Sequence, residues 1–278
     1  MKRSIILLFC YSLFWYRAEG AEQLKPAPLD ASYKLVFADD FDGQSINLGN
    51  WKVIATNHIG GGYSKNSLVK ENVVVADGFL NLLATRGLPG KRPYRSGFIV
   101  SQKSWSFGYW EARMKMPEKA KGVWPAFWMN KGGTYPEIDI FEWLGNKPKT
   151  QWLTYHPVDD VALTKGFGLG KEHDGPDFSA DFHVFGMWWQ PDKIVWYVDG
   201  VEVFTLKQGE TFKDKKVDIT ATAMDTILNC SVGGWNKNVV DDTTVFPARL
   251  LVDYVRIYSN DPKLPEVTSS HVANGVKP

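Results

Sequence analysis

The sequence has little cysteine, almost no excess charge and no internal repeat. Two cysteines in 278 residues cannot build the dense disulfide scaffold of a small secreted domain. A formal net charge of +1 provides no general basic surface, so we expect no nucleic-acid partner. What the chain does have is 44% hydrophobic and 23% charged residues, a globular composition with enough apolar side chains for a large core.

The longest apolar run lies at the N-terminus. Met1-Lys2-Arg3 precedes an apolar run from Ser4 to Tyr16, and small residues follow in Ala18-Glu19-Gly20, a pattern typical of a secretory signal peptide. A membrane anchor needs about 20 apolar residues, and Arg17 interrupts this run earlier. We therefore predict a signal peptide over residues 1–20, a secreted protein (extracellular or periplasmic), and no membrane association after cleavage.

Cleavage of this leader changes the remaining chain. It removes Cys10, leaves Cys230 without an internal disulfide partner, and shifts the net charge to −1. Stability must then come from the hydrophobic core. We expect a single domain over residues 21–260 and a flexible C-terminal tail over residues 261–278, where the composition turns to Pro, Ser, Asn and Lys.

Hydrophobic residues alternate with a period of two along most of the chain. From Tyr109 to Met116, Trp110, Ala112, Met114 and Met116 share one face, which predicts a half-buried strand. Asp77-Gly78 and Asp199-Gly200 separate apolar runs and predict hairpin turns, since both turn residues must tolerate positive φ. Further strands are predicted at Gly97–Ser101, Trp152–His156, Phe182–Trp189, Asp225–Val232 and Leu250–Tyr258. The pattern predicts an all-β fold, a two-sheet antiparallel β-sandwich of the jelly-roll type.

Three carboxylates gather in one predicted strand, Pro136 to Glu142. In a regular strand Glu137 and Asp139 share a face and Glu142 points away. A β-bulge between Asp139 and Glu142 restores the parity and places all three on one face. The carboxyl groups could then approach the ~5–5.5 Å separation of a retaining glycosidase. Mutual repulsion and partial burial would raise the pKa of at least one of them, as general-acid catalysis requires.

Two other interpretations of this acidic strand are a solvated outer face and a calcium cluster. The neighbouring side chains are apolar, which disfavours an exposed loop, and calcium sites draw on loop carbonyls. We therefore favour catalysis. The apolar neighbours are Ile138, Ile140, Phe141 and Trp143.

At these residues the sequence resembles glycoside hydrolase family 16, whose bulged signature is Glu-x-Asp-x-x-Glu. The resemblance implies a concanavalin-like jelly roll with a concave substrate cleft, and a glycoside hydrolase catalytic domain over residues 21–260. It covers nearly the whole chain after the leader. The other matching blocks, in order, are Val36 to Phe41 with Trp51, Asn72 to Leu82, Ser96 to Ile99, Phe107 to Pro117, Trp124 to Trp128, His183 to Gly200 and Leu251 to Tyr258.

The resemblance also implies roles for individual residues. Glu137 is expected to be the nucleophile, Glu142 the acid/base, and Asp139 the group that hydrogen-bonds the nucleophile and shares its titration. Sugar rings stack on aromatic side chains while polar groups read their hydroxyls. The expected substrate-binding residues are Trp124, Trp128, Trp235, Asn72, Glu111, His156, Asn229 and, in a basic loop from Arg86 to Arg95, Arg95.

Metal chemistry has little support in the sequence. The histidines show no His-Glu-x-x-His spacing and one remaining cysteine cannot build a zinc site, so no cofactor is expected to be required for catalysis. The family resemblance alone implies a structural calcium held by Asp40, Gly78 and Asp253.

Together these patterns predict a secreted, monomeric, retaining endo-β-glycosidase acting on a polysaccharide. A β-1,3- or β-1,3/1,4-glucan is the favoured substrate because near-zero charge suits a neutral glucan. The basic loop from Arg86 to Arg95 keeps open a sulfated or agar-type algal galactan, cleaved by an agarase, porphyranase or carrageenase. The sequence is also compatible with a transglycosylase and with a non-catalytic carbohydrate-binding jelly roll.

Overall fold

The computed structural model describes residues 29–57, 63–88, 91–157 and 168–267. These residues form β-strands and one short 3₁₀ turn, η1 (Lys70–Asn72). Among them, no helix has the length and apolar character that crossing a bilayer demands. The predicted leader, residues 1–20, lies outside the described residues. The chain still contacts the domain beyond the predicted boundary at residue 260, because the Val267 amide donates to the Leu35 carbonyl at 2.8 Å.

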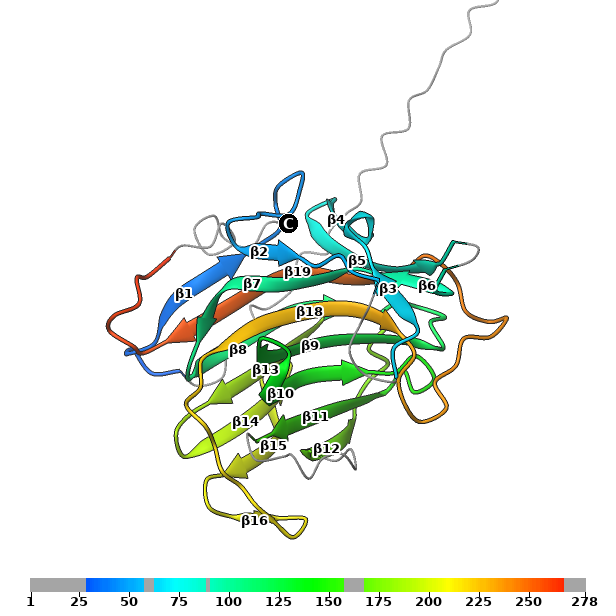
Figure 1. Ribbon diagram of the computed structural model, residues 1–278. Coiled ribbons are helices and arrows are strands. Elements are labelled where there is room, and N and C mark those ends of the chain that lie inside the picture. The colour runs from blue at the N-terminus through cyan, green and yellow to red at the C-terminus, as the bar shows by residue number, and fades with distance from the viewer. Residues whose placement is uncertain (1–28, 58–62, 89–90, 158–167, 268–278) are drawn as a thin grey trace, which may run out of the picture.

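One layer of the structure is a ten-stranded sheet, which lies behind the other layer in Figure 1. Its pairs are antiparallel except for the two strands at one edge, which run parallel. In spatial order it contains β15 (Val201–Lys207), β14 (Lys193–Val198), β13 (His183–Trp189), β8 (Gly108–Lys115), β19 (Ala248–Ser259), β5 (Phe79–Arg86), β6 (Tyr94–Ser96) and β3 (Asn66–Leu68), with β1 (Lys34–Asp39) beside β19 and β4 (Val73–Ala76) beside β5.

The second layer is a seven-stranded antiparallel sheet, whose curved strands cross the front of Figure 1. A small hairpin of β16 (Thr211–Phe212) and β17 (Lys215–Lys216) stands apart from both layers. In spatial order the seven strands are β12 (Leu169–Asp174), β11 (Thr150–His156), β10 (Thr134–Trp143), β9 (Val123–Lys131), β18 (Met224–Val232), β7 (Phe98–Trp105) and β2 (Trp51–Val53).

The core fills the space between the two sheets. Trp110, Ala112 and Met114 of β8 face it with no exposed surface, as their alternation predicts. The prediction of a half-buried β8 was wrong in one respect, because Tyr109 and Glu111 on its other face are also buried. β8 lies in the middle of the ten-stranded sheet between β13 and β19, so neighbouring side chains cover its outer face as well.

The two predicted hairpin turns are confirmed. Asp77 and Gly78 connect β4 to β5 with φ of 56° and 76°, and Asp199 and Gly200 connect β14 to β15 with φ of 50° and 77°. Positive φ at both positions is what a tight two-residue hairpin requires. The predicted all-β, two-sheet sandwich is confirmed as well. In its seven-stranded sheet, the neighbouring strands β9 and β10 carry the predicted site tryptophans and the three carboxylates.

Candidate active site

The predicted β-bulge is present in β10. Glu137 pairs with His156 of β11 and Asp139 with Thr154, two positions along each strand. The register then shifts, and Glu142 pairs with Trp152, so three residues of β10 span two of β11. The pairing of β10 with β9 has a register shift at the same place, between Asp139 and Phe141. The extra residue returns Glu142 to the face that holds Glu137 and Asp139.

Neighbouring strands hold each of the three carboxylates. Trp124 Nε1 of β9 donates to Glu142 Oε1 at 3.0 Å. His156 Nε2 of β11 lies 3.3 Å from Asp139 Oδ2 and 3.7 Å from Glu137 Oε1. Glu137 retains 22% of its side-chain exposure and Asp139 only 6%. A ligand therefore meets Glu137 more readily than the aspartate beside it.

Burial and mutual repulsion favour protonation of both glutamates. Burial raises the pKa of Glu137 to about 8, with a further contribution from the charge of Asp139, while His156 and Asn130 act in the opposite direction. Burial raises the pKa of Glu142 well above its usual value, and Asp139 and Glu137 raise it further. Only the hydrogen bond from Trp124 opposes that shift. Such strongly perturbed acids mark a candidate catalytic site.

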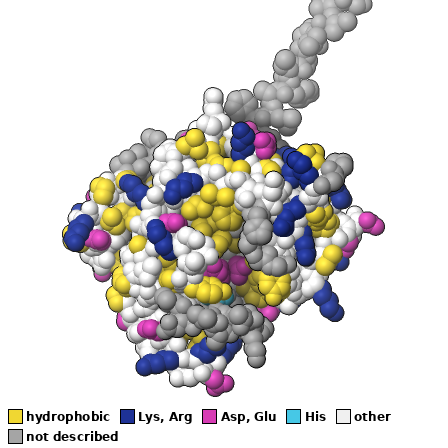
Figure 2. Space-filling view, viewed as in Figure 1, with side chains coloured by type: hydrophobic (Ala, Val, Ile, Leu, Met, Phe, Trp, Pro, Cys, Tyr) yellow, Lys and Arg dark blue, Asp and Glu magenta, His cyan; other side chains and the backbone are white. Residues whose placement is uncertain are grey.

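Aromatic side chains surround the three carboxylates. Trp235 packs edge-to-face against Trp124 and Trp152, with both pairs of ring centroids 5.3 Å apart. On β9, Trp128 Nε1 donates to Asn229 Oδ1 at 2.8 Å. Figure 2 shows this face, with Asp and Glu side chains at its centre and hydrophobic side chains beside them. Apolar rings next to a polar centre form the surface that stacks sugar rings.

Comparison with known proteins agrees with this geometry. The family model described as glycosyl hydrolases family 16 matches residues 63–256, which span both sheets and the three carboxylates. The chain belongs to glycosyl hydrolase family 16. It is therefore a glycoside hydrolase, an enzyme acting on O-glycosyl bonds, and its partner is a polysaccharide.

Relatives of this family 16 chain include enzymes of bacteria and archaea. It is 31% identical to a β-glucanase of Rhodothermus marinus over 86% of this chain and 88% of that one. It is 28% identical to glucan endo-1,3-β-glucosidase A1 of Niallia circulans over 83% of this chain but only 38% of that longer protein. The solved endo-β-1,3-glucanase of Pyrococcus furiosus is 32% identical, with a TM-score of 0.71 over 82% of this chain and 94% of that one.

Three predicted substrate-binding residues lie elsewhere in the family 16 fold. The Asn72 amide is buried and donates to the Leu83 carbonyl and Thr85 Oγ1 of β5, at 3.0 and 3.1 Å. Glu111 is buried on the outer face of β8, where Arg256 lies 3.8 Å away. Arg95 is in β6 of the ten-stranded sheet, where it pairs with Ser67 of β3 and Thr85 of β5. The substrate-binding role expected of these residues, from the family resemblance for Asn72 and Glu111 and from the basic loop for Arg95, stays a prediction.

Asn130, Trp152 and Tyr135 were missed by the sequence analysis although they border the carboxylates. Asn130 Nδ2 lies 3.4 Å from Glu137 Oε2, and Tyr135 stacks on the His156 ring with centroids 5.3 Å apart. Trp152 is the register partner of Glu142. The place of Asn130 depends on its register pairing with Glu137, which no local sequence pattern supplies.

The three positions predicted for calcium meet on the outer side of the ten-stranded sheet. Val252 pairs with Leu80 and Asp39 with Val255, so Asp40 and Gly78 both lie beside the middle of β19. Asp253 there contacts Arg113 at 2.6 Å, and Asp40 faces Arg256 at 3.6 Å. Carboxylate oxygens are ligands that calcium prefers, and a calcium ion takes six to eight oxygen ligands. Here, however, each of the two carboxylates faces an arginine. The calcium site stays a prediction.

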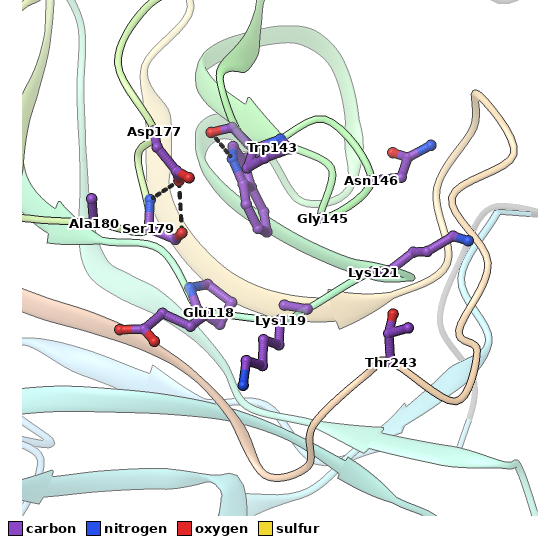
Figure 3. Close-up of a pocket in the computed structure, with 13 residues that line it drawn as sticks. Glu118, Lys119, Lys121, Trp143, Gly145, Asn146, Asp177, Ser179, Ala180 and Thr243 are labelled. Carbon is purple, nitrogen blue, oxygen red and sulfur yellow. Dashed lines mark hydrogen bonds between the residues drawn. The ribbon is translucent and has the colours of Figure 1, made fainter.

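A separate cavity of about 660 Å³ lies between the β8–β9 loop, the β10–β11 loop and residues 177–180 (Figure 3). Trp143 borders it but is fully buried, and its Nε1 donates to the Pro148 carbonyl at 3.1 Å. The side chains of Lys119 and Lys121 point away from the Trp143 ring (Figure 3). None of the three catalytic candidates lines this cavity, so it is distinct from the carboxylate site.

Proposed function

We propose that this family 16 protein is a secreted, endo-acting hydrolase of a β-1,3- or mixed β-1,3/1,4-glucan that works by double displacement. The observation that carries the proposal is the bulge in β10, which presents Glu137, Asp139 and Glu142 on one face. Two carboxyl groups flanking the scissile bond are what a retaining mechanism needs. The similar glucanases of Rhodothermus marinus and Pyrococcus furiosus support the glucan as substrate.

In this proposal Glu137 attacks the anomeric carbon and Glu142 protonates the leaving oxygen. The two glutamates differ in their neighbours. His156 and Asn130 favour the ionised form of Glu137, whereas both nearby acids raise the pKa of Glu142. Glu137 is therefore the glutamate that ionises first, and Glu142 is the one that keeps its proton for the first step. In the second step Glu142, now ionised, takes a proton from the water that releases the sugar from Glu137.

Asp139 completes the group by coupling to both glutamates. It lies between them on the bulged strand, and its Oδ2 faces His156 Nε2 at 3.3 Å. Its charge raises the pKa of both Glu137 and Glu142. Because the three acids are coupled, ionisation of one favours retention of a proton on another. Asp139 thereby helps Glu142 to keep its proton.

The neutral character of the site supports a glucan over a sulfated galactan. Within the described residues, no lysine or arginine forms an ion pair with Glu137, Asp139 or Glu142. Arg95, on which recognition of sulfate would depend, is in β6 of the other sheet and forms no ion pair with these three carboxylates within the described residues. The tryptophans at 124, 128, 152 and 235 provide stacking surface without charge.

Digestion of a polysaccharide panel tests the substrate proposal. Laminarin, lichenan, agarose, porphyran and carrageenan are incubated with the enzyme, and products are sized and assayed for new reducing ends. We expect laminarin or lichenan to yield a ladder of oligosaccharides with a matching rise in reducing ends. Cleavage of a sulfated galactan alone would refute the glucan proposal. Chain transfer with few new reducing ends would indicate a transglycosylase, and no turnover at all would indicate a binding module.

Chemical rescue by azide separates the roles of the two glutamates. With an activated β-glycoside, azide should replace the missing carboxylate in Glu137→Ala and give an α-glycosyl azide by one inversion. In Glu142→Ala the glycosyl-enzyme still forms, and azide should give the β-glycosyl azide by two inversions. NMR of the products distinguishes the anomers. The opposite pattern would exchange the two roles.

Secretion and the monomeric state belong to the same proposal. The leader over residues 1–20 is outside the described residues, so its cleavage has to be measured by N-terminal sequencing of protein recovered from the culture medium. We expect a start near residue 21 and a mass of one chain in size-exclusion chromatography with light scattering. Retention of the full chain in cells, or a stable dimer, would refute the respective part.

A further inference from the structure

Asn130 occupies a position that brings it against one oxygen of Glu137. It is the next-to-last residue of β9 and the direct register partner of Glu137 on β10. Its side chain is buried, with 3% exposure. Its Nδ2 donates to Glu137 Oε2 at 3.4 Å, a long hydrogen bond in a site where few groups contact the carboxylate.

The turn that follows β9 fixes the orientation of the Asn130 amide. Asn130 Oδ1 accepts a hydrogen bond from the Gly133 amide at 3.3 Å. Gly132 and Gly133 have φ of 64° and 79°, which lets the chain turn back tightly enough for this contact. Because a backbone N–H can only donate, the oxygen of the carboxamide must face Gly133 and its nitrogen must face Glu137.

The two oxygens of Glu137 are thus contacted from opposite sides. Oε2 faces Asn130 on β9, and Oε1 faces His156 on β11 at 3.7 Å. His156 is shared with Asp139, which lies closer to it at 3.3 Å. Asn130 is therefore the neutral donor specific to Glu137. Donation to the ionised form stabilises it and lowers the pKa of Glu137, opposing burial and the charge of Asp139.

We propose that Asn130 is a positioning residue that holds the Glu137 carboxylate in the orientation for attack through its Nδ2–Oε2 hydrogen bond. This inference rests on the proposed role of Glu137 as nucleophile. Asn130 itself does not exchange a proton or touch the sugar in this account. It acts on the rotamer and on the ionisation of Glu137, and both effects depend on the turn that orients its carboxamide.

The test compares Asn130→Leu, Asn130→Asp and the control Thr134→Val by pH profiles of kcat/KM. Leu removes the donor at similar volume, so kcat/KM should fall roughly tenfold, mainly in kcat, and the acidic limb should move to higher pH. The aspartate variant keeps the shape of the asparagine side chain but adds a negative charge beside Glu137. Its acidic limb should therefore move to still higher pH than that of the leucine variant. Thr134→Val removes the exposed Thr134 Oγ1 bond to the Lys131 carbonyl in the same turn and should leave the profile unchanged.

Two results would overturn the inference. One is a wild-type kcat/KM and acidic limb in both Asn130 variants, and the other is an equal change in Thr134→Val, which would assign the effect to the turn. Asn130→Asp keeps the inference testable if the leucine variant does not fold. Glu137→Gln is measured alongside. If it is inactive while the Asn130 variants match wild type, only this inference fails, whereas an active Glu137→Gln would refute the proposed nucleophile.

Discussion

The two sheets each carry a group of three carboxylates, and the two groups differ in the side chains that contact them. On the seven-stranded sheet, Glu137, Asp139 and Glu142 share one face of β10. On the outer face of the ten-stranded sheet, Asp40, Glu111 and Asp253 are buried to 7%, 2% and 6% exposure. Both groups consist of three acids in strands or directly after one, so residue type and burial alone do not separate the two groups.

The difference lies in the partners. On the ten-stranded sheet, Arg256 lies 3.6 Å from Asp40 and 3.8 Å from Glu111, and Arg113 lies 2.6 Å from Asp253. On the seven-stranded sheet, the partners within the described residues are His156, Trp124 and Asn130. Burial raises the pKa of Glu111 to about 7, and the charge of Arg256 opposes that shift by favouring the ionised form. Acids that lack such a partner exchange protons and attack carbon, at some cost to the stability of the fold.

The largest contrast is expected in activity. Glu142→Gln removes the proton donor, and kcat/KM on a glucan should fall by about 10²–10⁴-fold because general-acid catalysis contributes that much. Glu111→Gln on the arginine-paired side should leave kcat/KM within about threefold. Steady-state kinetics with both purified variants check this. A severe loss in Glu111→Gln would mean that the outer group serves the reaction and would end the comparison.

A large effect on stability is expected from removing the arginine. Arg256→Met leaves Asp40 and Glu111 buried without their cation, which should cost about 3–5 kcal/mol of unfolding free energy. Arg249→Met is the matched control, since Arg249 is exposed on the same strand, β19. Denaturant unfolding at pH 7 gives both values. Equal stability of the two variants would show that the arginine is not what keeps the outer carboxylates in place.

The catalytic group should show the reverse effect, a gain in stability on neutralisation. The folded state raises the pKa of Glu137 to about 8, so the folded protein disfavours its ionised form as the pH rises above the unfolded value near 4.5. Glu137→Gln should match wild type near pH 4 and exceed it by about 1–3 kcal/mol above pH 8. Thermal unfolding across this pH range measures the difference.

Glu118→Gln is the control for that experiment. Glu118 is 69% exposed and pairs with Lys115 three residues earlier, so its neutralisation should change stability by less than about 0.5 kcal/mol at every pH. If Glu137→Gln is no more stable than wild type above pH 8, the ionised form of Glu137 does not destabilise the folded protein.

The smallest effect is expected from Arg95. It lies in β6 of the ten-stranded sheet, between β5 and β3, and a neutral glucan offers no charge for it to bind, so Arg95→Ala should change KM for a neutral glucan by less than about twofold. A rise of tenfold or more would place this residue at the substrate and would revive the basic loop as a recognition element. Initial rates over a range of glucan concentrations decide between the two.

The sequence predicted the bulge because the chemistry required it. Only an inserted residue between Asp139 and Glu142 brings Glu142 back to the face of Glu137, and the register has that irregularity. The two hairpin turns were predictable for a similar local reason, since Asp-Gly at residues 77–78 and 199–200 tolerates positive φ. Local geometry of this kind is encoded within a few residues.

Placement across the sandwich was not predictable in the same way. Asn72, Glu111 and Arg95 were expected at the cleft, but they lie in or beside strands of the ten-stranded sheet, and the sheet that a strand joins depends on long-range pairing. Glu111 is buried because Arg256, 145 positions later, pairs with it across β8 and β19. Asn130 was missed for the opposite reason, because its role depends on a register contact with Glu137 that alternation alone does not supply.

The central claim is that Glu137 forms a covalent bond to the sugar. A 2-deoxy-2-fluoro β-glycoside with a good leaving group slows both steps and lets the glycosyl-enzyme accumulate, so that proteolysis and mass spectrometry can locate the sugar. We expect a 1:1 adduct on Glu137, inactivation in step with labelling, and no adduct in Glu137→Gln. An adduct on another residue, or full inactivation with Glu137 unlabelled, would contradict it.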